Sequence, residues 1–243
     1  LAICAAFALN TSCKKNDEKE DEIVIEDEIV ISGSLNVEEG KKQLEQNSIN
    51  FLNKIESLKD DTALNEMIDL AEFLNNPSPN ANTFEKSFYK TLSNVSELNN
   101  KDVNAFNTKQ AIALVDEKPL LSDFNNEKGI YTWNSNTEEF DFTGPSDDIV
   151  YNFSYDNGKN ATFTVTDFNT EISENEELPT LAKANLKIDN ITVFNQEFSA
   201  SINKTQLLPN TVKNTTSIGG FSFISSYDNS NNKEINETTE IKI

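Results

Sequence analysis

The sequence predicts an α+β fold, in which N-terminal amphipathic helices pack on a twisted antiparallel β-meander sheet. Two observations lead to this prediction. Apolar residues recur at helical spacing over residues 37–100, whereas over residues 101–243 the period falls towards two and polar turns follow at short intervals. Helices that precede a run of hairpins are typical of the α+β arrangement, in which the helices cover the apolar face of the sheet.

The helical part contains three expected helices. The first spans about 37–59. The second follows Asp61 or Thr62 as its capping residue and ends before Pro77, because proline cannot continue a helix. The third begins near Thr83. We interpret the apolar stripes of the second and third helices as core faces, formed by Leu64, Met67, Ile68, Ala71 and Leu74 and by Phe84, Phe88, Leu92, Val95 and Leu98.

The β part contains four expected hairpins. Residues 103–115 fit either a strand or a last helical turn, and we favour the strand. Polar turns, one of them with an Asn-Gly pair, separate the strands of each hairpin. The expected strand pairs are 129–133 with 139–143, 148–155 with 161–167, 181–188 with 191–198, and 220–226 with 234–243.

Charge and composition exclude several functional classes. The 243 residues carry a net charge of -21, and the chain contains no histidine. Its basic residues are all lysine, and without a basic surface that includes arginine we expect no nucleic-acid partner. The lack of histidine excludes Ser-His-Asp and Cys-His catalysis and the commonest transition-metal ligand.

The N-terminus predicts export and lipidation. An apolar lead over residues 1–9 is followed by Asn10-Thr11-Ser12-Cys13 and then by acidic residues. Leu9 to Cys13 resembles a bacterial lipobox, and the acidic run is similar to the export signal of Bacteroidetes surface lipoproteins. The resemblance implies a signal-peptide remnant over 1–12, a lipidated Cys13 that starts an acidic tether over 13–36, and an outer-membrane location at the cell surface or facing the periplasm. The alternative is that the lead is an apolar segment of the core.

The tether contains a short repeat. Asp21 to Ile25 and Asp27 to Ile31 each place three β-branched residues after two acids. Each repeat could form a short strand on the edge of the sheet, or both could belong to a self-repelling spacer.

A second resemblance covers most of the chain from Lys41. The helix-then-hairpin order, with Gly129 to Asn134 leading into one hairpin and Glu177 to Thr180 into long strands, is similar to that of uncharacterised outer-membrane lipoproteins of Flavobacteria. It implies a location and an order of elements, but no activity and no functional residues.

Two motifs are candidate sites. Trp133, Tyr131 and Phe140 could form an aromatic platform for a sugar ring, or they could be a cross-strand part of the core. Asp61-Thr62-Ala63 is similar to the O-glycosylation motif of Bacteroidetes, which would place a glycan on Thr62, and a helix cap explains the same residues.

Acidic clusters lie near the expected turns, at Glu138-Glu139 with Asp141, at Asp147-Asp148, and at Glu174 with Glu176-Glu177. Paired carboxylates can hydrolyse glycosides or bind calcium, but no spacing signature of either accompanies these residues. We expect solvated faces, and no catalytic residue, metal or cofactor.

These features favour an envelope-anchored lipoprotein that acts as a non-catalytic binding or structural module. Its membrane contact would be the lipid on Cys13, and its protein or glycan partner stays open. One alternative is a carrier that holds an acyl chain in a half-barrel cavity, which an interior cavity lined by Phe, Ile and Leu would support. The other is a hydrolase with an acidic site, which converging carboxylates in a cleft would support.

Overall fold

The computed structural model describes residues 61–74, 78–99, 114–115, 118–173, 175–203, 208–229 and 236–242, together with residues 46 and 49. The chain divides into two compact units, residues 1–56 and 57–243, and nearly all described residues belong to the second. Three expected segments lie outside the described residues, namely the helix over 37–59, the tether and most of 103–115. Within them the structure describes Gln46 and Ile49, which are helical, and Leu114 and Val115, which form a turn.

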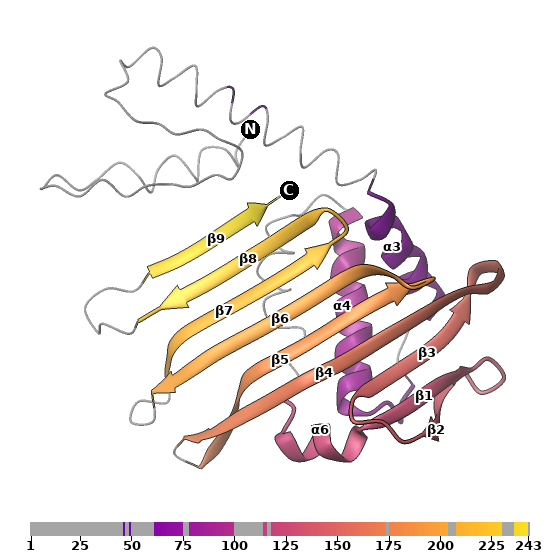
Figure 1. The fold of residues 1–243 in the computed structure, drawn as a ribbon, viewed down its shortest axis with the longest axis horizontal. Helices are drawn as coiled ribbons and strands as arrows, with labels where there is room; N and C mark the ends of the chain where they lie inside the picture. The colour runs from indigo at the N-terminus through magenta and orange to yellow at the C-terminus, as the bar shows by residue number, and fades with distance from the viewer. Residues whose placement is uncertain are drawn as a thin grey trace, which may run out of the picture. The chain divides into compact units, whose positions relative to one another are not determined.

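The second unit is built on a nine-stranded sheet with the order β2-β1-β3-β4-β5-β6-β7-β8-β9 (Figure 1). Its strands are β1 (Gly129–Asn134), β2 (Glu139–Gly144), β3 (Ile149–Tyr155), β4 (Lys159–Ser173), β5 (Glu176–Ile188), β6 (Ile191–Asn203), β7 (Leu208–Ile218), β8 (Phe221–Asp228) and β9 (Asn236–Lys242). All four expected hairpins are present.

The prediction of an antiparallel meander is confirmed from β3 to β9, but it is wrong where β1 meets β3. β1 pairs with β2 in antiparallel fashion and with β3 in parallel fashion. The chain therefore crosses from β2 past β1 to begin β3, which leaves the short strand β2 at one edge of the sheet.

Three helices complete the described α+β unit, namely α3 (Thr62–Leu74), α4 (Thr83–Asn99) and α6 (Leu121–Glu127). The expected cap of α3 is confirmed, because Asp61 Oδ1 accepts a hydrogen bond of 3.0 Å from the backbone N–H of Leu64. At the start of α4, Asn82 Oδ1 accepts a bond of 2.8 Å from the backbone N–H of Glu85.

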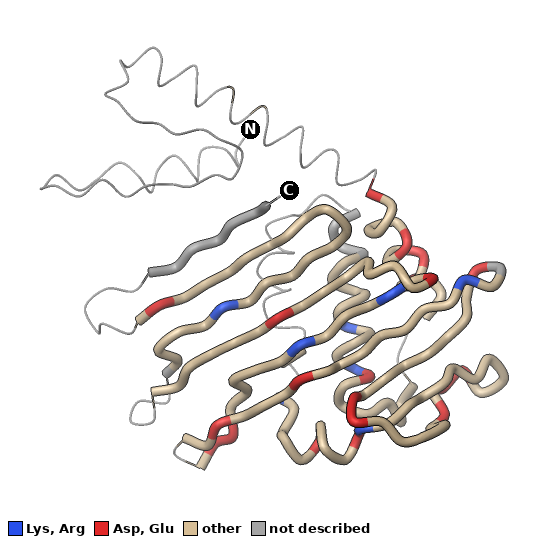
Figure 2. Tube along the Cα trace, in the orientation of Figure 1, with Lys and Arg blue, Asp and Glu red and all other residues tan. Residues whose placement is uncertain are grey.

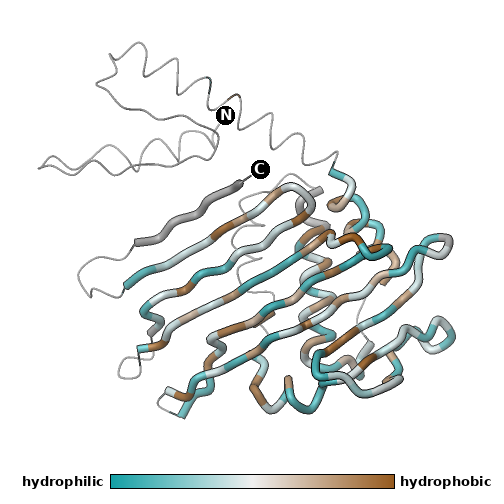
Figure 3. Tube along the Cα trace, viewed as in Figure 1, coloured by the Kyte–Doolittle hydropathy of each residue, from teal (hydrophilic) through white to brown (hydrophobic). Residues whose placement is uncertain are grey.

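The core lies between these helices and one face of the sheet. Phe88 of α4 stacks on Phe163 of β4 with ring centroids 4.3 Å apart, and Phe84 meets Phe168 edge-on at 5.3 Å. Buried and half-exposed residues alternate along β3, and hydropathy alternates along the neighbouring strands in Figure 3. One face of β3 to β5 is therefore apolar and covered, and the other carries polar side chains.

Among the described residues, no helix is both long and apolar enough to cross a membrane.

Candidate functional site

A pocket of about 400 Å³ lies where the parallel pairing of β1 and β3 ends. The last paired residues are Thr132 and Asn152, whereas β3 continues to Tyr155 and pairs there only with β4. Beyond Thr132 the two strands separate, and the pocket occupies that gap. It is lined by Thr132, Trp133, Ser135, Asn152, Phe153, Ser154, Asn160, Ala161 and Thr162.

Two hydrogen-bonded side-chain pairs from β3 and β4 form the polar wall of the pocket. Thr162 Oγ1 donates to Asn152 Oδ1 at 2.8 Å, and Ser154 Oγ donates to Asn160 Oδ1 at 2.8 Å. Each pair joins residues directly opposite one another in the β3–β4 hairpin. The pairing fixes the orientation of both amides, because each amide oxygen is already bonded.

The same pairing leaves hydrogen-bonding capacity for a ligand. Asn152 Nδ2 has no hydrogen-bond partner in the part of the chain that the structure describes, and the hydroxyl oxygens of Thr162 and Ser154 can still accept. The pocket therefore offers donors and acceptors in fixed positions.

None of the lining residues is charged, although a quarter of the residues in the chain are. An anion bound here would have no cationic partner and would meet a protein of net charge -21, whereas a metal cation would find no carboxylate ligand. The pocket thus suits an uncharged ligand that is rich in hydrogen-bonding groups.

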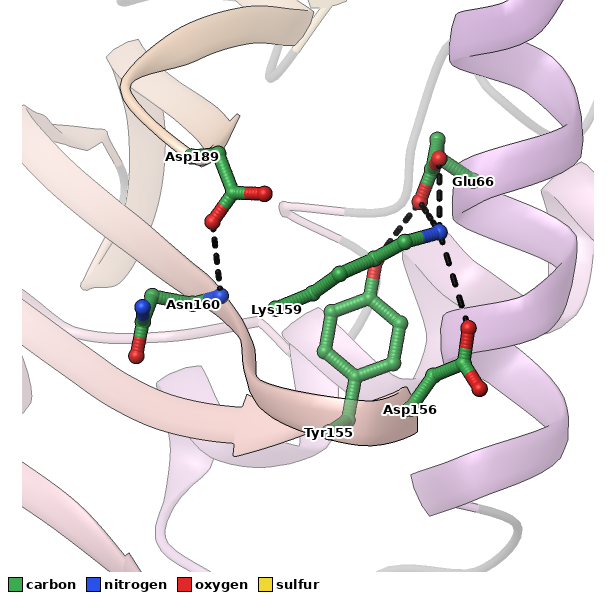
Figure 4. A network of polar contacts seen from close by, with 6 residues as sticks. All are labelled: Glu66, Tyr155, Asp156, Lys159, Asn160 and Asp189. Atoms are coloured by element: carbon green, nitrogen blue, oxygen red, sulfur yellow. Dashed lines mark hydrogen bonds and ion pairs between the residues drawn. The ribbon is translucent and has the colours of Figure 1, made fainter.

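A polar network holds the β3–β4 hairpin against α3 (Figure 4). Lys159 Nζ lies 2.8 Å from the Glu66 carboxylate and 3.6 Å from Asp156 Oδ2, and Tyr155 Oη donates to Glu66 Oε2 at 3.0 Å. Burial, with the Glu66 carboxylate beside it, raises the pKa of Tyr155, so its hydroxyl stays protonated and donates. The turn that ends the pocket wall is therefore fixed to a helix.

The next hairpin supports the wall from the other side. The backbone N–H of Asn160 donates to Asp189 Oδ1 at 3.0 Å (Figure 4). The backbone N–H of Asp189 donates to the carbonyl of Asn160 at 2.8 Å. Both residues of the Asp189-Asn190 turn have positive φ, 47° and 68°, as a two-residue type I′ hairpin turn requires.

The structure brings the three predicted aromatic residues together. Trp133 and Phe140 are cross-strand partners with ring centroids 5.1 Å apart, and Tyr131 stacks on Tyr151 at 5.2 Å. Tyr131 Oη donates to the backbone carbonyl of Glu127 at 2.9 Å. All three rings pack against the core, and Trp133 also lines the pocket. A sugar platform on these rings remains a prediction.

Glu139 and Asp141 of the predicted acidic clusters have different hydrogen-bond partners. Glu139 Oε1 accepts from Ser78 Oγ at 2.6 Å, and Asp141 accepts from Asn134 Nδ2 at 2.8 Å. Glu138 and Asp147 are exposed. In the part of the chain that the structure describes, no three His, Cys, Asp or Glu side chains are grouped as a metal ion would require.

Two glutamates that the sequence does not single out as caps bind the first backbone N–H groups of remote helices. Glu177 Oε1 accepts from the backbone N–H of Leu121 at 2.7 Å, a bond that lowers the pKa of Glu177. Glu127 accepts from the backbone N–H groups of Thr83 and Phe84, each at 3.1 Å, and burial raises its pKa. These carboxylates neutralise unpaired donors at helix N-termini and so have a structural role.

Of the two predicted modification sites, the structure describes Thr62 but not Cys13. Thr62 is the first residue of α3 and is exposed, so glycosylation there stays a prediction. Cys13 lies outside the described residues, and its lipidation also stays a prediction.

No family model, curated protein or solved structure matches the chain.

Proposed function

We propose that this chain is an envelope-anchored lipoprotein whose α+β unit is a non-catalytic binding module. The anchor would be the lipidated Cys13, and the ligand would occupy the pocket between β1 and β3. The uncharged lining of that pocket is the observation that carries the proposal. Amides and hydroxyls held in place by cross-strand bonds favour a neutral ligand with several hydroxyl groups, and carbohydrate is the class with that chemistry.

The pocket is preorganised for such a ligand. Glu66 on one side and Asp189 on the other hold the β3–β4 turn, and each bond is made without a ligand. Because little ordering is left to occur on binding, the entropic cost of association is low. Trp133 also lines the pocket, and its ring packs against Phe73 of α3 and Phe140.

The carrier alternative requires an apolar interior cavity, and the packing of α4 gives it no support. Phe88, which stacks on Phe163, also lies 5.8 Å from Phe153, so rings fill this part of the helix–sheet interface. The acidic-site hydrolase would need carboxylates that converge in a cleft, and no carboxylate lines the pocket.

Tryptophan fluorescence tests the pocket directly, because Trp133 is the single tryptophan of the chain and lines it. We expect neutral mono- and disaccharides, screened as a panel, to shift or quench this emission in a saturable way. Asn152→Ala should weaken binding by about 2- to 10-fold, as expected for loss of one hydrogen bond. Asn125→Ala, the same change at an exposed position of α6, is the control and should leave affinity unchanged.

An unchanged affinity in Asn152→Ala, or no saturable response to any neutral saccharide, would contradict the proposed ligand site. Circular dichroism spectra and melting temperatures of each variant separate loss of a contact from loss of the fold.

Metabolic labelling tests the anchor. Cells that express the full precursor with radiolabelled palmitate should yield labelled protein in the membrane fraction, whereas Cys13→Ala should be unlabelled and released to the soluble fraction. Equal membrane retention of both proteins would refute lipid anchoring at Cys13.

A further inference from the structure

A row of uncharged polar residues crosses five strands on the face of the sheet opposite the helices. Cross-strand pairing joins its members one to the next, in the order Thr164 (β4), Asn185 (β5), Asn195 (β6), Ser217 (β7) and Ser222 (β8). We call this row the polar strip. No bulge interrupts it, since the register shifts of these strands fall at other residues.

Each member of the polar strip points away from the core. Its neighbours along the strand are buried on the other face, for example Phe163 and Val165 beside Thr164, or Phe194 and Gln196 beside Asn195. All five strip residues are half-exposed. Among the described residues, the side chains of Asn185 and Asn195 make no hydrogen bond, so both amides are available to a ligand.

The strip is bounded on one side by charged residues and on the other by the pocket and by Lys187, which pairs with Thr162. The adjacent row contains Asp167, Lys183 and Glu197, and the first two of these form an ion pair at 3.7 Å. On β4, Thr164 follows Thr162 of the pocket on the same face. Figure 2 shows long uncharged stretches between the charged positions on these strands.

The spacing of the strip suits a chain molecule with a short repeat. Neighbouring strands lie about 4.8 Å apart, so the five residues span about 19 Å. The distance of about 4.8 Å between neighbouring strands is close to the length of one pyranose unit. A sugar polymer that crosses the strands would therefore present hydroxyl groups to successive strip residues, about one ring per strand.

We propose that the polar strip binds an extended segment of a neutral polysaccharide, about four sugar units long, whose end or branch occupies the pocket. The inference rests on the proposed function and extends it from a single sugar to a polymer. An anionic polymer would be repelled by the net charge of -21, and a lipid would gain nothing from amides and hydroxyls.

Oligosaccharides of graded length test the strip. Calorimetry would measure the affinity of series of one to six units prepared from neutral linear glucans, mannans and xylans. For the series that binds, affinity should rise at least tenfold between two and five units and then level off. The double variant Asn185→Ala/Asn195→Ala should remove this gain and leave the affinity for the disaccharide unchanged, while Asn125→Ala should alter neither.

The outcomes separate the two proposals. Disaccharide binding that is weakened in Asn152→Ala but does not increase with chain length would overturn the strip and leave the pocket. A gain with length that the double variant abolishes, in a protein insensitive to Asn152→Ala, would overturn the pocket as ligand site and support the strip. Absence of binding at every length would overturn both.

Discussion

Glu85 is a carboxyl group in the core with one oxygen that has no hydrogen-bond partner among the described residues. The residue is 6% exposed, and Glu85 Oε1 has no hydrogen-bond partner. Burial raises the pKa of Glu85 to about 7, and the charges of Glu139 and Glu127 act in the same direction, while a backbone hydrogen bond from Asn82 and the charge of Lys86 oppose the shift. The protonated form is therefore the one that the folded state prefers.

Glu85→Gln should stabilise the protein at pH 8. The ordinary pKa of a glutamate is about 4.5, and that of Glu85 in the folded protein is about 7. Between these pH values the folded state keeps a proton that the unfolded chain has released, so the free energy of unfolding falls as pH rises. Glutamine keeps the shape and the bond from Asn82 but cannot ionise. Urea unfolding should show a gain of about 1 to 3 kcal/mol over wild type at pH 8 and little difference at pH 4.5.

The pH dependence itself is the control for Glu85, because an effect of the substitution that does not involve ionisation would be the same at every pH. A constant difference between variant and wild type from pH 4.5 to pH 8 would mean that Glu85 does not titrate in the core.

At the level of elements, α3 and the β7–β8 turn approach closely at a glycine. Gly219 has φ +53°, a conformation that L-residues with a side chain rarely adopt. A Cβ added there would lie 2.7 Å from Cγ of Asp61, the residue that caps α3. The hairpin turn and the cap of α3 therefore both require a residue without a side chain at position 219.

Gly219→Ala should reduce the free energy of unfolding by about 1 to 3 kcal/mol, through left-handed strain and displacement of the Asp61 cap. Gly220→Ala is the matched control, because nothing lies within 4 Å of its added Cβ, and it should change stability by less than about 0.5 kcal/mol. Urea unfolding of both variants measures the difference. Equal effects would show that the contact with Asp61 does not constrain the turn.

The contact between α3 and the β3–β4 hairpin depends on Glu66. Glu66→Ala removes the acceptor of the buried Tyr155 hydroxyl and the partner of Lys159, and should cost about 1 to 3 kcal/mol. Glu72→Ala, at an exposed position of the same helix, should cost under about 0.5 kcal/mol. Thermal unfolding followed by circular dichroism compares them. If both variants melt alike, the network of Figure 4 does not hold the hairpin.

Some elements could be predicted from the sequence because their apolar period is complete. In α4 the predicted Phe84, Phe88, Leu92 and Val95 are buried. In α3 the predicted Leu64, Met67 and Leu74 are buried, but Ile68 and Ala71 are only partly buried, and the buried Leu70 was not predicted. α6 was missed, because seven residues are too few to show a helical period. β7 was missed because its inward face includes the polar residues Asn214 and Thr216, which are buried, so the strand lacks apolar alternation.

The candidate pocket could not be predicted for a topological reason. Its strands β3 and β4 were expected as a hairpin, and Asn152 and Thr162 could be placed opposite one another on the polar face. The parallel pairing of β1 with β3 joins distant segments and has no local turn signal. The pocket lies where that pairing ends. The sequence pattern therefore predicts the β3–β4 hairpin that forms one wall, but not the space between β1 and β3.

For the whole molecule, the dominant electrostatic feature is the excess of 41 acidic over 20 basic residues. Ion pairs such as Lys183 with Asp167 leave this excess unchanged, because the net charge of -21 already counts every lysine. Like charges confined to a folded body repel, which favours expansion of the chain and opposes folding. Salt shortens the range of that repulsion, from about 30 Å at 0.01 M to about 8 Å at 0.15 M.

Added salt should therefore stabilise the protein at neutral pH, and by an amount that depends on its net charge. Raising KCl from 0.01 M to 0.15 M at pH 7 should increase the melting temperature by about 2 to 4 °C for each kcal/mol of repulsion removed. The same change at pH 4.3, near the isoelectric point of about 4.3, provides the control, because the net charge there is close to zero. Differential scanning calorimetry measures both shifts. An equal increase at the two pH values would mean that salt acts on apolar burial and not on charge, since apolar burial is present at both while the net charge is present only at pH 7.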